Sequence, residues 1–442
     1  MKRHILYLLI IPVLFLFSCR ADDSDDIITS QESFCKLTSV ELIETNVNRT
    51  TFCSNVTQAQ SYLMLIPINS ILSSCNNGID SISFYRVKYE STINNTKVNL
   101  SGLLIIPNTY SIDSFPVLAA NHETMSLVSD APSLGYYNIA STSIYSSMTY
   151  GGFIVMIPDY EGFGENVQSS NYNQNTIPCF QNVHPYCVLD RCGIPTADMI
   201  ISTKKYINSH KSTFGKSVKD DTYMIGYSEG GYVSIASQKT IEENQTKYSS
   251  INLKGVAALA GNFDLSGSML DSILSINGYY TPYVVAMIIQ SYQRNYGEEF
   301  SWNNVIKVPY NTTIPPLLDG LHSGTSEISI QMPNHIRDYF TNNIISDLIN
   351  KTGIWNRFAD NDLYLAIDRG WTPKTPIYLC HHPKDETVPY SNSLNFKNKA
   401  IAKGCDIVLV DAVSLLSYDY HQYAAADAIP KGFKWIYNKE YN

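Results

Sequence analysis

The chain has 442 residues, of which 44% are hydrophobic, and a formal net charge of −9 at pH 7. This length accommodates one catalytic domain with an insertion, or two more modest domains. The acidic balance and the lack of a Lys/Arg-rich stretch after residue 3 exclude nucleic acid as an expected partner. Tyrosine is abundant, at 32 residues. Such rings either line a site for amphipathic ligands or form half-buried surface, and the Asn- and Ser-rich composition favours the second.

Residues 1–19 are predicted to be an export signal. Lys2 and Arg3 supply a positive start, and the apolar run that follows is too short to span a bilayer. Its end, Leu-Phe-Ser-Cys19, resembles the bacterial lipobox, which implies that Cys19 is lipidated and becomes the mature N-terminus. A plain secretory signal is the alternative.

Residues 20–78 are then expected to form an acidic tether, with Asp-Asp-Ser-Asp-Asp at 22–26, and an N-terminal extension. Acidic residues after a lipidated cysteine also resemble the surface-export signal of Bacteroidetes lipoproteins. We therefore expect an exported protein, held by lipid in the bacterial cell envelope at the outer membrane or cell surface. The lipid anchor is its only expected membrane contact.

Eight of the nine cysteines remain once Cys19 is set aside. An even number in an exported chain predicts disulfides, although spacing alone does not select the pairs. No Cys-x-x-Cys spacing occurs among them, so we expect no zinc site. The eight are Cys35, Cys53, Cys75, Cys179, Cys187, Cys192, Cys380 and Cys405.

Apolar and β-branched runs predict the strands. Residues 27–75 alternate short apolar and polar runs and are expected to pack as helices, whereas 82–90 and 97–107 predict an antiparallel hairpin. Continuous apolar strands then alternate with helices such as 195–209, with Pro195 in its first turn. This alternation indicates an α/β fold, with a mostly parallel sheet covered on both faces. The buried strands are predicted at 115–121, 152–157, from 223 onward, 255–261, 376–381 and 406–410.

The alternation stops between residues 264 and 375, where only helical, tyrosine-bearing stretches such as 279–292 and 335–348 remain. This span is too long for a simple loop in a compact domain. We therefore predict a helical cap at 265–375, inserted over the carboxyl ends of the strands of a core formed by 79–264 and 376–442.

The stretch Gly226-Tyr227-Ser228-Glu229-Gly230 follows an apolar strand and precedes a helical run. A serine at a tight strand-to-helix turn is forced out of the sheet. Neighbouring side chains would collide in such a turn, which explains the glycines two residues before and after the serine. This context predicts that Ser228 is a nucleophile.

A serine nucleophile needs a base within hydrogen-bond reach and a third group that orients the base. The chain order for this kind of elbow is serine, acid, histidine. His421 lies beyond the last predicted strands and is the expected base. Asp385 is the expected acid, with Asp411 and Asp419 as rivals. The histidines at 381–382 precede the acid and are not expected to act as the base.

Three motifs together resemble the α/β-hydrolase superfamily, nearest to its secretory-lipase branch of the Candida antarctica lipase A type. They lie at 226–231, at 158–164 (Pro-Asp-Tyr-Glu-Gly-Phe-Gly) and at 385–389 (Asp-Glu-Thr-Val-Pro). The resemblance covers roughly residues 80–440 and implies a helical cap where the insertion falls. It also implies an oxyanion hole made by the backbone N–H of Glu229 and by that of Glu123 or Thr124. Many relatives have His-Gly in the second loop, where this chain has His122-Glu123.

The sequence thus predicts an exported serine hydrolase of the lipase or esterase type, with an acyl-enzyme on Ser228 and no metal or cofactor. A capped, tyrosine-lined pocket favours a small-molecule ester or lipid with an apolar acyl or aromatic group. A serine exopeptidase is the alternative, because Glu298, Glu299 and Glu327 in the predicted cap could hold a substrate amine. A third interpretation is a noncatalytic surface binding protein. It is disfavoured because it does not explain why Ser228, Asp385 and His421 occur in the order that this kind of hydrolase requires.

Overall fold

The computed structural model describes residues 35–59, 65–75, 78–109, 112–137, 140–164 and 183–442. The predicted export signal with Cys19, the acidic tether and Cys179 lie outside these residues. Within them, no helix has both the length and the apolar character needed to cross a bilayer.

The described residues form a nine-stranded sheet in the order β1-β2-β3-β5-β4-β6-β7-β8-β9. Neighbouring strands from β1 to β5 pair antiparallel, and those from β5 to β9 pair parallel. Continuous apolar runs become parallel strands because helices bury both of their faces. The strands are β1 (Leu37–Asn48), β2 (Ser81–Ile93), β3 (Thr96–Asn108), β4 (Ser114–Asn121), β5 (Ile154–Pro158), β6 (Ser217–Tyr227), β7 (Asn252–Leu259), β8 (Ile377–His381) and β9 (Ile407–Asp411).

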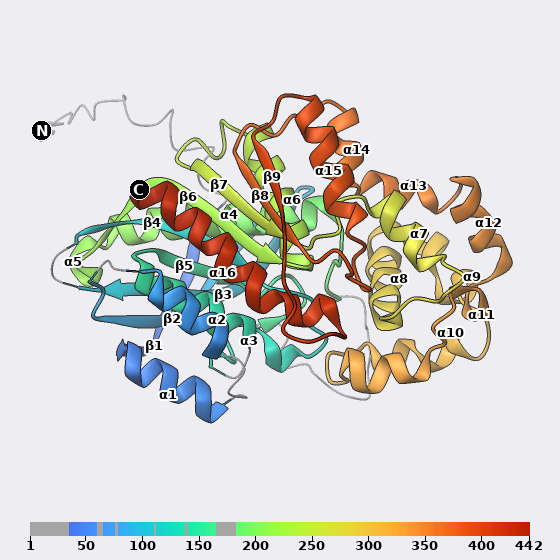
Figure 1. The fold of residues 1–442 in the computed structure, drawn as a ribbon, viewed down its shortest axis with the longest axis horizontal. Coiled ribbons are helices and arrows are strands. Elements are labelled where there is room, and N and C mark those ends of the chain that lie inside the picture. Colours follow the sequence, from blue (N-terminus) through green and yellow to red (C-terminus); the bar gives the residue numbers. More distant parts are fainter. Residues whose placement is uncertain (1–34, 60–64, 76–77, 110–111, 138–139, 165–182) are drawn as a thin grey trace, which may run out of the picture. The chain divides into compact units, whose positions relative to one another are not determined.

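Helices cover the two faces of this sheet (Figure 1). On one face α16 (Tyr420–Tyr441) crosses β6, β7 and β8 and packs against α2 (Leu65–Ser73), beside α3 (Ala140–Ser147). On the other face α4 (Leu189–Ser209) packs against α6 (Glu229–Glu243). The remaining α-helices that the structure describes outside residues 265–375 are α1 (Arg49–Ala59), α5 (Lys211–Phe214) and α15 (Ser391–Ala402). The predicted α/β-hydrolase arrangement of strands and helices is confirmed.

Two local predictions are wrong. Residues 37–48 form edge strand β1 rather than a helix, because Val40, Leu42 and Val47 pair with β2 through several register shifts that blur the period-two pattern. Helix α4 begins at Leu189, so Pro195 lies inside it and not in its first turn. Gly193, two residues before Pro195, packs directly on α6, where an added Cβ would lie 2.6 Å from the Ala236 carbonyl oxygen.

Residues 265–375 connect β7 to β8 and contain no named strand. Most of them lie beyond the carboxyl ends of the parallel strands, coloured yellow to orange-brown in Figure 1, and the last residues run back to the start of β8, where Thr375 contacts Glu242 and Leu253. Apolar side chains such as Ile289, Phe300 and Phe358 enclose a small internal cavity and give this segment its own core. Its α-helices are α7 (Leu270–Ile273), α8 (Pro282–Tyr296), α9 (Trp302–Val305), α10 (Tyr310–Thr313), α11 (Ile336–Tyr339), α12 (Asn342–Asn350), α13 (Trp355–Asp360) and α14 (Leu363–Asp368).

Many tyrosines are buried in the core, which corrects the expectation of half-buried surface. Several of their hydroxyls donate to distant backbone carbonyls, as where Tyr150 donates to Val47 (2.8 Å) and Tyr232 donates to Asn361 (2.7 Å). Those of Tyr89, Tyr145 and Tyr339 have no hydrogen-bond partner among the described residues. The fully buried tyrosines are Tyr89, Tyr145, Tyr150, Tyr186, Tyr223, Tyr232, Tyr248, Tyr279, Tyr292 and Tyr339.

The seven cysteines that the structure describes are all free thiols, so the predicted disulfides are absent among them. They lie on separate elements or bond elsewhere: the Cys187 sulfur accepts from Asn262, and the Cys192 thiol donates to the Pro185 carbonyl. Burial raises the pKa of Cys380 to about 12, which keeps this thiol protonated at neutral pH.

Candidate active site

Ser228 stands at the turn between β6 and α6, with a left-handed φ of 57°. This φ is strained for a residue with a side chain, and the two flanking glycines make the turn possible. A Cβ on Gly226 would lie 2.1 Å from the Gly230 carbonyl oxygen. A Cβ on Gly230 would lie 2.0 Å from the carbonyl oxygen of Asn121 at the end of β4. The glycines therefore allow α6 to start directly against the neighbouring strand.

The structure brings Ser228, His421 and Asp385 into one hydrogen-bonded chain. The imidazole Nε2 of His421 lies 2.8 Å from Ser228 Oγ, and its Nδ1 lies 2.6 Å from Asp385 Oδ2. Burial alone would raise the pKa of the Asp385 carboxyl, but the charge and hydrogen bonds of His421 and His381 outweigh burial and lower it. Burial would likewise lower the pKa of His421, yet Asp385 raises it above its ordinary value of 6.5.

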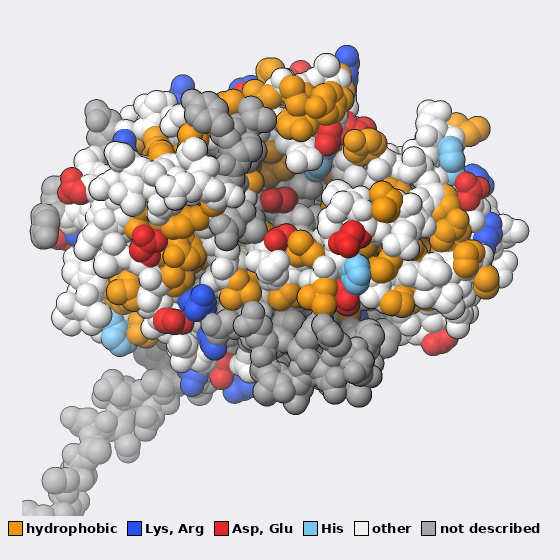
Figure 2. All heavy atoms as spheres, turned by 90° about the horizontal axis from the view of Figure 1, so that it is seen from below, with side chains coloured by type: hydrophobic (Ala, Val, Ile, Leu, Met, Phe, Trp, Pro, Cys, Tyr) orange, Lys and Arg blue, Asp and Glu red, His pale blue; other side chains and the backbone are white. Residues whose placement is uncertain are grey.

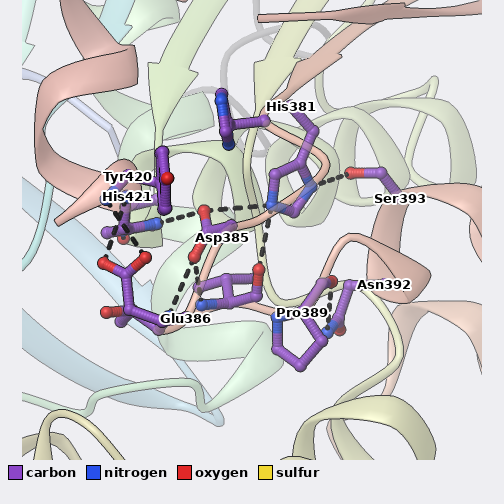
Figure 3. Close-up of polar contacts among 12 residues, drawn as sticks. His381, Asp385, Glu386, Pro389, Asn392, Ser393, Tyr420 and His421 are labelled. Carbon is purple, nitrogen blue, oxygen red and sulfur yellow. Dashed lines mark hydrogen bonds and ion pairs between the residues drawn. The ribbon is translucent and has the colours of Figure 1, made fainter. Parts of the chain in front are cut away.

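Both oxygens of the Asp385 carboxylate have hydrogen-bond partners besides His421. Its Oδ1 accepts the backbone N–H groups of Thr387 (2.9 Å) and Val388 (2.7 Å). Its Oδ2 also lies 3.1 Å from Nε2 of His381, whose Nδ1 lies 2.8 Å from Ser393 Oγ. Figure 3 shows Asp385 between the two imidazoles. The sequence did not assign this role to His381, although its place at the end of β8, four residues before the acid, was the available signal.

Two further residues hold the backbone of His421, and neither was predicted from the sequence. The Glu386 carboxylate accepts the N–H groups of Tyr420 (3.1 Å) and His421 (3.4 Å), which caps the first turn of α16 (Figure 3). The hydroxyl of Tyr227 donates to the His421 carbonyl oxygen over 2.5 Å. The position of the imidazole therefore depends on more than its bond to Asp385.

The rival acids are placed differently. Asp411 ends β9, and its Oδ1 accepts the hydroxyl of Tyr390 at 2.7 Å. Asp419 precedes α16 with a left-handed φ of 46° and raises the pKa of His421 through its charge alone. Among the described contacts of the His421 imidazole, only Asp385 supplies a carboxylate oxygen at hydrogen-bond distance.

The predicted oxyanion donors come from two adjoining segments. Glu229 is the first residue of α6, where a helix leaves its N–H groups without intrahelical partners. Glu123 and Thr124 follow β4, and the Thr124 hydroxyl lies 3.0 Å from that of Tyr186. His122 is 2.7 Å from the Glu123 carbonyl oxygen through Nδ1, and burial lowers its pKa to about 3. The choice between the N–H groups of Glu123 and Thr124 stays a prediction.

The three acids that suggested a substrate-amine site have other surroundings. Glu299 pairs with Arg357 at 2.7 Å, and Glu327 accepts the backbone N–H of Ser323 at 2.6 Å. Glu298 is exposed at the surface of the 265–375 segment. The contacts of these acids give no support to the exopeptidase alternative.

Apolar side chains are exposed close to His421 in the sequence. Val413, Leu415 and Tyr418 precede it in the loop after β9, and Tyr280 projects from the start of the 265–375 segment. The ring of Tyr418 packs against that of Tyr423, which lies two residues after His421. Tyr280 lies close enough to Tyr423 for the two side chains to interact electrostatically. Figure 2 shows one face of the molecule with a hollow near its middle, and with hydrophobic and acidic side chains beside it.

Residues 136–441 match the secretory lipase family. The chain belongs to this family. No curated protein matches it by sequence. Membership of the secretory lipase family confirms that the chain is a carboxylic ester hydrolase, and the family's secretory character agrees with the predicted export.

Solved structures of similar fold agree with this family. A putative hydrolase of Legionella pneumophila is 20% identical, covers 92% of this chain and 99% of its own, and has a TM-score of 0.72. The rice cell wall degrading esterase LipA of Xanthomonas oryzae is 20% identical, covers 90% and 97%, and scores 0.70. Candida antarctica lipase A is 14% identical, covers 85% and 76%, and scores 0.58. At these identities the likeness establishes the fold of this secretory lipase and not its substrate.

Proposed function

We propose that this secretory lipase cleaves carboxylic esters through an acyl-enzyme on Ser228. The hydrogen-bonded chain from Ser228 through His421 to Asp385 is the observation that carries the proposal. His421 accepts the serine proton as Ser228 Oγ attacks the ester carbonyl carbon, and Asp385 stabilises the imidazolium. The N–H of Glu229, with that of Glu123 or Thr124, stabilises the oxyanion of the tetrahedral intermediate.

The second half of the reaction regenerates the enzyme. His421 returns its proton to the alcohol oxygen as the C–O bond breaks, which leaves the acyl group on Ser228. A water molecule then gives a proton to His421 and attacks the acyl carbonyl, and the proton passes back to Ser228 as the carboxylic acid leaves. No oxidant or co-reactant other than water is required.

The proposed substrate is an ester with an apolar acyl or aromatic group. The exposed side chains of Val413, Leu415 and Tyr418, which precede His421 in the chain, and of Tyr280, close to Asp419 and Glu386, support this class. We propose that the 265–375 segment acts as the cap. We also propose that the mature protein is lipid-anchored through Cys19 in the cell envelope. The structural neighbour from Xanthomonas oryzae is described as acting on rice cell wall, which makes esters of aromatic acids a second set to test.

Hydrolysis of p-nitrophenyl esters of graded acyl length, measured beside aminoacyl anilides, tests this function. We expect ester turnover that exceeds anilide turnover, and covalent labelling of Ser228 by a fluorophosphonate. Ser228→Ala should abolish both while keeping the circular dichroism spectrum of the parent. Anilide turnover above ester turnover would favour the exopeptidase, and labelling that persists in Ser228→Ala would overturn the nucleophile assignment.

A further inference from the structure

A second acid–imidazole pair lies buried at the residue that follows the proposed nucleophile in the chain. Glu229 Oε1 is 2.5 Å from His184 Nε2, and their side chains are 0% and 6% exposed. Glu229 follows Ser228 in the chain, whereas His184 comes from the segment that precedes α4. The proposed reaction uses the backbone of Glu229 but gives no role to its carboxyl or to His184.

The hydrogen bonds of this pair fix its proton count. His184 Nδ1 lies 3.0 Å from the backbone carbonyl oxygen of Glu161, which can only accept, so Nδ1 carries a hydrogen. The contact between Nε2 and the Glu229 carboxyl is short and therefore contains one more proton, either on the imidazole or on the carboxyl. In both cases the pair of side chains has no net charge.

The neutrality matters because of where Glu229 stands. It opens α6, whose N-terminus carries a partial positive charge and supplies the proposed oxyanion donor. A lone carboxylate at this point would cancel that potential and repel an oxyanion in a region of low dielectric constant. Glu229 Oε2 is buried and has no hydrogen-bond partner among the described residues, so His184 is the partner that compensates this carboxyl.

Rings and charges around the pair hold His184 in place. Its imidazole stacks on Tyr160 with ring centroids 5.6 Å apart, and Phe163 packs beside it. The Glu161 carboxylate does not compete for the histidine, because it pairs with Arg191 and Arg294. The other titratable groups within electrostatic reach of the pair, among described residues, are His122, Glu123, Tyr160, Tyr186, Cys187, Cys192 and Tyr283.

We propose that His184 is a positioning residue for ester hydrolysis: by sharing one proton with Glu229, it keeps the start of α6 free of negative charge and so preserves the oxyanion hole. This inference rests on the proposed acyl-enzyme mechanism. It requires that the fall in kcat on replacing His184 come from the negative charge left on Glu229, and not from the lost packing of the imidazole ring.

Three variants separate charge from packing: His184→Gln, Glu229→Gln and the double variant. His184→Gln should lower kcat by roughly 10- to 100-fold with little change in KM, a loss below that of removing an oxyanion donor outright. The double variant should recover most of this kcat, because a neutral amide replaces the unpaired carboxylate. The ratio of His184→Gln to wild-type kcat should rise as pH falls, since an unpaired buried carboxyl has a raised pKa and regains its proton.

Fluorophosphonate titration counts the folded sites in each preparation and corrects kcat for them. Proton NMR of the wild-type protein supplies a measurement that does not depend on a variant folding. We expect two far-downfield imidazole resonances, of which Asp385→Asn removes one and Glu229→Gln the other. A kcat loss in His184→Gln that is independent of pH and not recovered in the double variant would overturn the proposal, as would a missing second resonance. A wild-type protein without esterase activity would instead refute the proposed function, and this inference with it.

Discussion

The hydroxyl of Tyr227 donates to the backbone carbonyl of His421, 2.5 Å away. The residue before the proposed nucleophile thereby contacts the proposed base through a bond that does not involve the catalytic groups. Together with the Glu386 carboxylate at the first turn of α16, it fixes where the His421 backbone lies. The loss of a side-chain partner of the imidazole is therefore expected to change the chemistry of His421 more than its position.

Asp385→Asn tests the assignment of the acid. The amide should keep the shape of the site but favour the wrong imidazole tautomer, which lowers kcat by on the order of 10³- to 10⁴-fold. Steady-state kinetics on a p-nitrophenyl ester measure this loss. Asp411→Asn and Asp419→Asn are matched controls and should cost far less, because neither carboxylate bonds to the imidazole. Near-normal turnover in Asp385→Asn, with collapse in either control, would move the acid to that residue.

The pH profile of kcat/KM follows from the pKa of His421, which Asp385 raises above 6.5. The imidazole acts as a base only when neutral, so activity should fall as pH falls through this raised value, and the midpoint of the acid limb should lie above pH 6.5. In Asp385→Asn the residual activity should show its acid limb at lower pH, since burial then acts without the carboxylate. An acid limb that stays in place in this variant would disprove the assignment.

Gly226→Ala should destabilise the fold and remove activity together. The added methyl group would lie 2.1 Å from the Gly230 carbonyl oxygen, which is backbone and cannot rotate away. We expect a loss of at least the roughly 1–3 kcal/mol typical of overpacking, measured by denaturant unfolding. Gly404→Ala is the comparison: its φ of 82° is left-handed, unlike that of Gly226, but no atom lies within 4 Å of the added Cβ, so it introduces backbone strain without a clash. A loss in Gly226→Ala no larger than that in Gly404→Ala would show that the clash with Gly230 does not explain the requirement for glycine.

Cys19→Ser tests the lipid anchor. The wild-type mature protein should begin at a lipidated Cys19 and partition into detergent, whereas the variant should enter the aqueous phase or remain unprocessed. Mass spectrometry of the N-terminus is the measurement. An unmodified N-terminus at Arg20 or beyond would show that the export signal is an ordinary secretory one.

The elements that patterns of a few residues specify were predictable from the sequence. The elbow was predictable because the clash that a side chain at position 226 would make with Gly230 involves residues close in sequence. The buried strands were predictable as apolar runs. The edge strand β1 was not, because bulges shift its register and its outer face meets solvent. Pro195 misled because proline is enriched in the first turn of a helix without being confined to it, and α4 begins earlier, at Leu189.

The supporting residues of the site were beyond the reach of the sequence. Glu229 was predicted only for its backbone N–H, because nothing in the sequence relates its side chain to His184, 45 residues away. The sequence did not favour His381 as the base, which is consistent with its contacts. Its contact with Asp385 could not be predicted, because it depends on how the turn at 382–385 folds back toward the end of β8. Partners that meet through tertiary folding leave no spacing pattern.

The position of the 265–375 segment bears on how such enzymes can be engineered. The segment leaves the sheet after β7 and returns at β8, and these strands are direct neighbours, with Val256 opposite Ile377. Because the two strands are parallel, the segment leaves at the carboxyl end of β7, where Leu259 lies opposite Cys380, and returns at the amino end of β8. Its last residues therefore form the crossover between the strands, and Thr375 donates its backbone N–H to Glu242 at the far end of α6. Chimeras that exchange the helices of the segment but keep this return path should leave Ser228 and His421 on an unaltered sheet.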